Sequence, residues 1–293
     1  MLADGPDDRF LGAAMSWSGR HGAAELHVLV DDPGAAGVLA RKAVQFTDPP
    51  AVWLIEGTTL VAAAPDPVPP RAEPPAPPEL VDVLIDAGVE IVVEGGLVRG
   101  EVNGLEVARI VAGETSAGVP LDAPLLEVGV GKADRELTAT VHGDLTPVDQ
   151  LARVVDIVRQ HRRPGAPRHP LNQLVPERWL RAVLCRAPEV VGLADLRPAE
   201  GTRPRPNLSE RDVAVATGHD ESSAPVVLAC SVGIALDLVP TAADARAALD
   251  PDAALVLAVP ARDDHPGTRR LAAALRSPAT VVPIPGDWHS AAG

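Results

Sequence analysis

Residues 225–284 decide the fold class and read PVVLACSVGIALDLVPTAADARAALDPDAALVLAVPARDDHPGTRRLAAALRSPATVVPI. The stretch contains three short apolar runs, at 225–232, 254–259 and 280–284. A helix is expected to open at Thr241 after the first run, and another has Pro266 in its first turn after the second run. Strands and helices that alternate over short connections predict parallel strands joined by right-handed crossovers. The chain is therefore expected to have an α/β fold.

The first part of the chain shows the same alternation on a smaller scale. Residues 26–30 are expected to form a strand, 35–46 a helix, and 52–63 a strand or a hairpin around Gly57. A segment of this length buries only a marginal core. We therefore expect residues 1–64 to form a small α/β lobe that docks on the rest of the chain.

A proline-rich segment follows this lobe. Eight of the fourteen residues from 65 to 78 are proline, which excludes a helix and a central strand. At about 3.1 Å per residue, an extended spacer of this kind reaches roughly 40 Å. We expect it to separate the lobe from an α/β domain of residues 79–293. The sequence leaves open whether the C-terminal βαβαβ unit, residues 213–293, joins the sheet of the middle part.

The middle part predicts an αβββα unit with one further helix. The expected elements are a helix at 79–87, strands at 89–98, 105–111 and 125–130 with a continuation toward Val141, and helices at 147–162 and 176–187. Glycines between the apolar runs favour an antiparallel meander. Thr146 and Pro147 open the 147–162 helix as N-cap and first helical residue. Residues 191–212, rich in proline, arginine and glycine from 197 onward, are expected to form a loop.

The order of elements in residues 79–162 resembles the core of restriction-endonuclease-like nucleases, the PD-(D/E)XK fold. The resemblance implies that Glu106 and Glu127 hold Mg²⁺, and that Lys132, the only lysine nearby, completes the catalytic group. The sequence departs from the family pattern because Gly129 stands where its lysine belongs. Lys132 lies five residues after Glu127, an odd offset that places it on the opposite face of a regular strand unless a bulge intervenes.

A cluster of arginines provides the second candidate site. Residues 151–190 carry a local charge of +5 in a chain whose net charge is −14. The candidate contact residues for a phosphate backbone or an acidic partner are Arg159, Arg162, Arg163, Arg168, Arg178 and Arg181. The same residues also suit structural roles, because cations complement a helix C-terminus and pair with the surplus carboxylates of the chain.

The third candidate site lies where the C-terminal parallel strands end. Residues 229–233, ACSVG, imitate a nucleophile elbow with Ser231 at its centre. An elbow serine opens directly into a helix, whereas the next helix here is expected only after Pro240. A small anionic ligand held by helix N-termini is therefore favoured over hydrolase chemistry at this edge.

Composition limits the class of protein and the location that the chain can have. A hydrophobic fraction of 46% and a mean hydropathy of +0.10 are typical of a folded chain. Two cysteines, Cys185 and Cys230, are too few for a disulfide framework, which favours a reducing, cytoplasmic location. Acidic residues near the N-terminus argue against a signal peptide, and the absence of a run of about 20 apolar residues argues against a membrane span.

These patterns predict a soluble, non-catalytic accessory or binding module without a cofactor. Its expected partner is nucleic acid or an acidic protein, contacted through the arginine-rich segment 153–186. The alternative is a metal-dependent nuclease, or a degenerate relative of one, that uses Mg²⁺.

Overall fold

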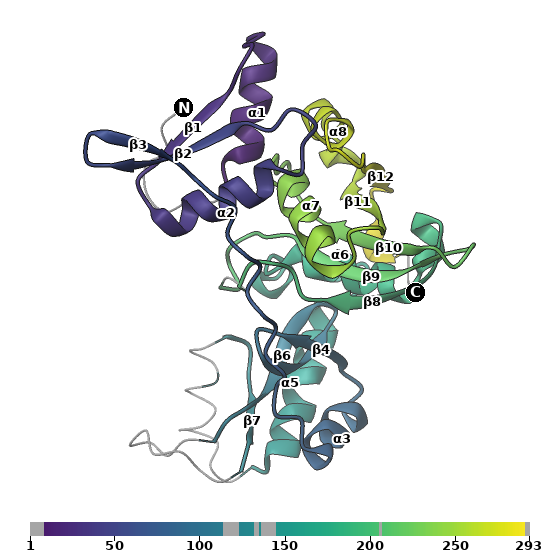
Figure 1. The fold of residues 1–293 in the computed structure, drawn as a ribbon. Helices are drawn as coiled ribbons and strands as arrows, with labels where there is room; N and C mark the ends of the chain where they lie inside the picture. The colour runs from purple at the N-terminus through teal and green to yellow at the C-terminus, as the bar shows by residue number, and fades with distance from the viewer. Residues whose placement is uncertain (1–8, 114–122, 132–134, 136–144, 205–206, 291–293) are drawn as a thin grey trace. The chain divides into compact units, whose positions relative to one another are not determined.

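The computed structural model describes residues 9–113, 123–131, 135, 145–204 and 207–290, which form two compact units (Figure 1). The first unit comprises Met1–Pro69, Pro188–Leu196 and Val213–Gly286. The second comprises Pro70–Ala187, Arg197–Asp212 and Asp287–Gly293. The expected small lobe therefore belongs to the same unit as the C-terminal strands. No helix among the described residues is long and apolar enough to cross a membrane.

The C-terminal part of the first unit is the βαβαβ arrangement expected from the sequence. Strands β10 (Pro225–Cys230), β11 (Ala254–Pro260) and β12 (Thr280–Ile284) are parallel neighbours. Helices α7 (Leu238–Leu249) and α8 (Pro266–Ala273) connect them. The central strands β10 and β11 are apolar and buried, as parallel strands usually are.

Two further strands extend this sheet on the β10 side. Strand β9 (Ala214–Asp220) pairs with β10 in antiparallel fashion, and β8 (Leu193–Ala199) lies beyond β9. Neither strand was predicted from the sequence, and the expected loop at 191–212 is wrong for the residues of β8. Pro198 and the polar residues at 195 and 197 obscure the pattern, but an edge strand tolerates them because one of its sides needs no ladder partner.

The N-terminal part of the first unit consists of α1 (Leu11–Arg20), β1 (His27–Val30), α2 (Pro33–Ala43), β2 (Ala51–Glu56) and β3 (Thr59–Ala62). Strands β1 and β2 are parallel, and β2 and β3 form a hairpin, which is one of the two arrangements expected for residues 52–63. Helix α1 was not predicted from the sequence. The buried Arg41 side chain on α2 pairs with Asp244 on α7, so ionic contacts as well as apolar packing join this part to the C-terminal part.

The second unit is built on one antiparallel sheet of four strands. They are β4 (Glu90–Glu94), β5 (Leu97–Val102), β6 (Leu105–Val111) and β7 (Leu125–Val128), in that order. Three strands were expected from the sequence, but Gly95 and Gly96 both have positive φ and form a tight turn that divides the run 89–98. This sheet is separate from that of β8–β12, so the C-terminal strands do not extend it.

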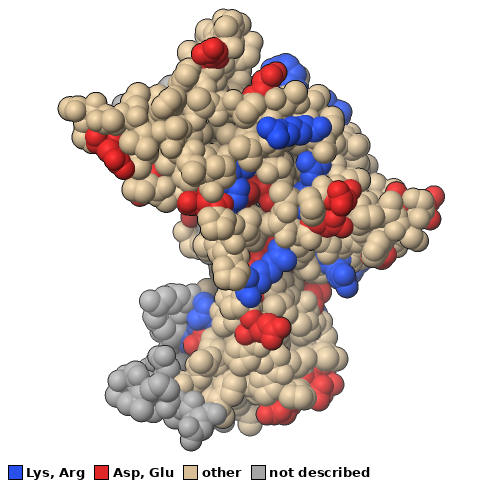
Figure 2. Space-filling model, viewed as in Figure 1, with Lys and Arg blue, Asp and Glu red and all other residues tan. Residues whose placement is uncertain are grey.

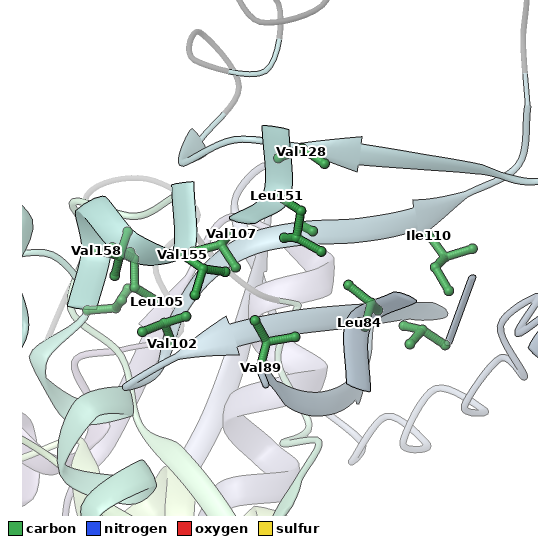
Figure 3. Packing of buried hydrophobic residues seen from close by; sticks show 13 residues of the cluster. Leu84, Val89, Val102, Leu105, Val107, Ile110, Val128, Leu151, Val155 and Val158 are labelled. Atoms are coloured by element: carbon green, nitrogen blue, oxygen red, sulfur yellow. The ribbon is translucent and has the colours of Figure 1, made fainter. Parts of the chain in front are cut away.

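The hydrophobic core of the second unit lies on one face of this sheet. Helices α3 (Pro78–Asp86) and α5 (Pro147–His161) contribute Leu84, Leu151 and Val155, which pack against strand residues such as Val98 and Val107 (Figure 3). Thr146 accepts the N–H of Asp149 and caps α5 as predicted. Helix α6 (Pro176–Arg186) instead meets charged side chains of β4 and β5 through its arginines.

Candidate functional site

The two glutamates of the nuclease resemblance lie on neighbouring strands and converge on one arginine. Glu106 on β6 is buried and accepts hydrogen bonds from Arg99 and, at 3.2 Å, from Arg135. Glu127 on β7 accepts a hydrogen bond of 2.8 Å from Nε of Arg109. Its carboxylate also lies 3.6 Å from Nε of Arg135. The two carboxylates thus share Arg135 as an ion-pair partner.

Among the described residues, the cation that both glutamates contact is Arg135. Lys132, the lysine that the resemblance assigns to the catalytic group, lies outside the described residues. Arg135 follows it by three positions, and nothing in the expected acidic-x-Lys pattern pointed to it. Arg99, Arg109 and Arg135 were all missed as site residues. Arg99 and Arg109 could have been found from cross-strand spacing, because Arg109 lies opposite both Arg99 on β5 and Glu127 on β7.

The electrostatics of this group do not suit a divalent metal ion. Among the described residues, three guanidinium groups pair with two carboxylates, so positive charge is in excess in this described group. Burial lowers the pKa of Arg135, and the neighbouring Arg109 lowers it further. A hard cation such as Mg²⁺ needs oxygen ligands that are not already neutralised. No group of three or more His, Cys, Asp or Glu residues in the described ranges is arranged to hold a metal. The residues therefore do not fit the Mg²⁺ site that the resemblance implies.

A row of buried ion pairs lies between α6 and the sheet of the same unit. Arg178 makes two hydrogen bonds to Glu94, at 2.8 and 2.9 Å, and Arg181 donates to Glu101 at 2.9 Å. All four of these side chains are buried. Further along α6, the partly exposed Arg186 pairs with Glu90 and also donates to Asn103 at 2.7 Å.

These ion pairs offset a repulsion between carboxylates that the strand register creates. Glu90 and Glu101 lie directly opposite each other on β4 and β5, where two like charges destabilise a sheet. Burial raises the pKa of Glu90, and the nearby charge of Arg186 opposes that rise. The arginines of α6 therefore allow a row of acidic side chains to be buried on one face of the sheet.

The structure divides the six arginines that were expected to contact a partner. Arg162, Arg178 and Arg181 are buried and cannot form part of a surface strip, which corrects the expectation for these three. Arg159, Arg163 and Arg168 are exposed. The Arg159 guanidinium donates to the carbonyl oxygens of Ala87 and Gly88 at the end of α3, and that of Arg163 donates to the Gln160 carbonyl.

Arg162 is held inside the second unit by backbone carbonyls and an aromatic ring. It donates to the carbonyl oxygens of Asn103, Leu171 and Leu174 at 2.7–3.1 Å. Its guanidinium carbon lies 4.6 Å from the centre of the Trp179 ring. Burial lowers the pKa of Arg162 to about 10. This residue closes the C-terminus of α5 and orders the loop after it, which is a structural role.

The edge beyond the parallel strands is closed by side chains of the protein itself. Ser231 is buried, and α7 begins only at Leu238, so the strand-to-helix turn of a nucleophile elbow is absent at this serine. The N–H of Gly233 donates to the Asp263 carboxylate at 2.7 Å. His265 caps α8 by accepting the N–H of Gly267. His265 thus takes the place of an anionic ligand at the N-terminus of α8, whereas α7 has no side-chain cap at its N-terminus.

One concave surface was not indicated by any sequence pattern. A cleft of about 600 Å³ lies between the second half of α1 and the segments that lead into β1 and β2. Its ionisable lining residues are Glu25, His27 and Asp48. The indole N–H of Trp53 donates to Nδ1 of His27 at 3.0 Å, which leaves Nε2 to carry the ring proton 3.2 Å from Glu25.

Comparison with protein families, with curated proteins and with solved structures found no match for this chain.

Proposed function

We propose that this chain is a non-catalytic binding module that contacts an acidic protein through the exposed face of α5 and the segment after it. The observation that supports the absence of catalysis is the engagement of Glu106 and Glu127 by three arginines. Carboxylates paired with guanidinium groups in this way are poor metal ligands, because the neighbouring positive charges repel a metal cation. The group instead acts as an ion-pair network that fixes β5, β6 and β7 to one another.

The contact surface is defined by the arginines that remain exposed. They are Arg153 and Arg159 on α5, and Arg163 and Arg168 in the segment that follows. Two apolar side chains on α5 are also exposed, Val148 at 54% and Ile157 at 43%. Arginine beside apolar side chains is characteristic of protein–protein interfaces, whereas a polyphosphate surface is more uniformly polar. An acidic protein is therefore a better partner than nucleic acid.

The proposal is tested with defined polyanions as probes. Binding of the full chain to polyglutamate and to duplex DNA is measured by fluorescence anisotropy at several salt concentrations. The triple variant Arg153→Glu, Arg163→Glu and Arg168→Glu should lose polyglutamate binding by at least about tenfold, because each reversal repels the probe. Arg20→Glu, on α1 of the first unit, serves as the matched control. Equal binding by parent and triple variant, or tighter binding of DNA than of polyglutamate, would refute the choice of partner.

A nuclease remains the second candidate, for one reason. The carboxylates of Glu106 and Glu127 converge on a common side chain, as the acidic residues of that class do on their metal. The test is cleavage of supercoiled and single-stranded DNA by the full chain in Mg²⁺. A nuclease requires cleavage that is lost in Glu106→Gln and in Glu127→Gln and retained in Glu25→Gln. Cleavage with that pattern would replace the binding-module proposal.

A further inference from the structure

We propose that the outer edge of β3 pairs with the same edge of a second copy of this chain, which forms a two-fold symmetric dimer. Strand β3 is the last strand of the three-stranded sheet β1-β2-β3, and among the described residues no strand lies beyond it (Figure 1). All four residues of Thr59–Ala62 are exposed. An edge of this kind is a template for another strand.

The hydrogen-bond pattern identifies which backbone groups face outward. The N–H of Ala63 donates to the Val52 carbonyl at 2.9 Å, and the register places Val61 opposite Leu54. In an antiparallel ladder, hydrogen-bonded pairs alternate with non-hydrogen-bonded pairs. The backbone groups of Val61 therefore point toward β2. Those of Leu60 and Ala62 point away from it, toward the outer edge.

These outward groups match those of an identical strand. When two β3 strands run antiparallel about a two-fold axis at Val61, Leu60 of each copy lies opposite Ala62 of the other. Each such pair exchanges both of its backbone hydrogen bonds. Because the contact is isologous, one short edge supplies both halves of the interface. Val61 then faces Val61 of the second copy across the axis.

The side chains support the same arrangement. The register aligns Leu29 with Trp53, Trp53 with Ala62, and Ile55 with Leu60, so these residues share one face of the sheet. Helix α2 packs on the opposite face, where the intervening valines of β1 and β2 are buried. Leu60 is 49% exposed. Pairing of the two edges places Leu60 of each copy beside Ala62 of the other on this face, which buries part of these exposed side chains.

The charge distribution makes β3 a surface on which a second copy can dock. With a net charge of −14, two copies repel each other over most of their surfaces. Strand β3 contains no ionisable residue and no proline, and the surface over β3 is mostly uncharged in Figure 2. It lacks the lysines, prolines and bulges that usually protect an edge strand. Two copies therefore meet here without bringing carboxylates together.

The test is the mass of the full chain in solution, measured by sedimentation equilibrium at concentrations up to about 100 µM, a range that detects weak dimers. The parent chain should approach twice its mass of 30.3 kDa. Val61→Lys and Val61→Glu should each be monomeric, because a like charge then faces itself across the axis. An equimolar mixture of the two variants should dimerise again. Ala62→Pro should also weaken the dimer, since it removes an outward N–H and leaves the ladder to β2 intact.

The matched control is Val93→Lys, on the edge strand β4 of the second unit, where Val93 is 50% exposed. This variant should keep the mass of the parent, and circular dichroism should show that every variant is folded. A parent chain that stays monomeric at the highest concentration would overturn the proposal. A dimer that persists in both Val61 variants would overturn it as well, because the interface would then lie elsewhere.

Discussion

Arg178 on α6 and Glu94 on β4 form a buried pair joined by two parallel hydrogen bonds, at 2.8 and 2.9 Å. The residues are 84 positions apart in the sequence. Bidentate geometry makes this pair strong and directional. It fixes the orientation of α6 on the sheet at a place where most helices use apolar side chains alone. The second unit should therefore be sensitive to the loss of either partner.

We predict that Arg178→Met or Glu94→Leu alone lowers the free energy of unfolding by about 3–5 kcal/mol, because each leaves an unpaired buried charge. The double variant should recover most of this loss, since apolar side chains of similar volume replace the pair. Urea denaturation measures both effects. Arg186→Met is the control, because its pair with Glu90 is partly exposed and should be worth no more than about 1 kcal/mol. Additive losses in the double variant would contradict the prediction.

A second prediction concerns the attachment of the N-terminal part of the first unit. Arg41 donates to Asp244 through Nε at 2.9 Å and Nη2 at 3.1 Å, and its third nitrogen donates to the carbonyls of Asp66 and Pro67. Asp244→Ala should cost about 3–5 kcal/mol, because it leaves the buried guanidinium without its carboxylate. Limited proteolysis should then cut within residues 44–69 faster than in the parent. Unchanged proteolysis would mean that apolar packing alone holds this part.

The third prediction rests on a close approach between backbones. Gly104 has φ +74°, and a Cβ at this position would lie 2.3 Å from the carbonyl oxygen of Arg178. Gly57 has a similar φ of +59°, but a Cβ there would meet no atom within 4 Å from any residue other than its two chain neighbours. Gly104→Ala should therefore cost about 1–3 kcal/mol more than Gly57→Ala, because only the first adds a clash to the backbone strain. Thermal unfolding of the two variants gives the comparison.

The sequence was sufficient for elements whose signals are local. The helix opened by Thr146, the hairpin at Gly57 and the parallel strands β10–β12 were predicted because caps, turn residues and apolar runs lie within each segment. Strand β8 was missed because its pairing with the rest of the sheet, and not its composition, makes it a strand. The division into two units was missed for a related reason, since the contacts of Arg41 and Lys42 span about two hundred residues.

The candidate site was predictable only in part. The sequence singled out Glu106 and Glu127, and the structure brings both to Arg135. The sequence could not show that arginines would pair with these glutamates, because the arginines come from three different segments. The arginine-rich segment contains helix α6, in which eight consecutive residues from 177 to 184 are buried. Net charge alone cannot distinguish the buried Arg178 and Arg181 from the exposed Arg163. Burial depends on the glutamates of β4 and β5, which lie some eighty residues earlier.

The last prediction concerns pH. Both carboxylate oxygens of Glu177, in the first turn of α6, are buried and accept no hydrogen bond from another described residue. Burial raises the pKa of Glu177 from 4.5 to about 6, against the opposing effects of its own backbone N–H and of the charge of Arg178. A carboxyl with a raised pKa favours the folded state in its protonated form. Its contribution to stability is therefore complete below pH 4.5 and is lost as the pH rises through 6.

That loss amounts to about 2 kcal/mol, since each pKa unit corresponds to about 1.4 kcal/mol. Glu177→Gln removes the titration, so the variant should become more stable than the parent by about this amount above pH 6, and should match it near pH 4. Urea denaturation of both proteins from pH 4 to 7.5 measures the difference. Glu73→Gln, at an exposed position, should leave the pH profile of the parent unchanged. A Glu177→Gln profile parallel to that of the parent would show that Glu177 acquires a charge-stabilising partner in solution, in which case its burial carries no penalty.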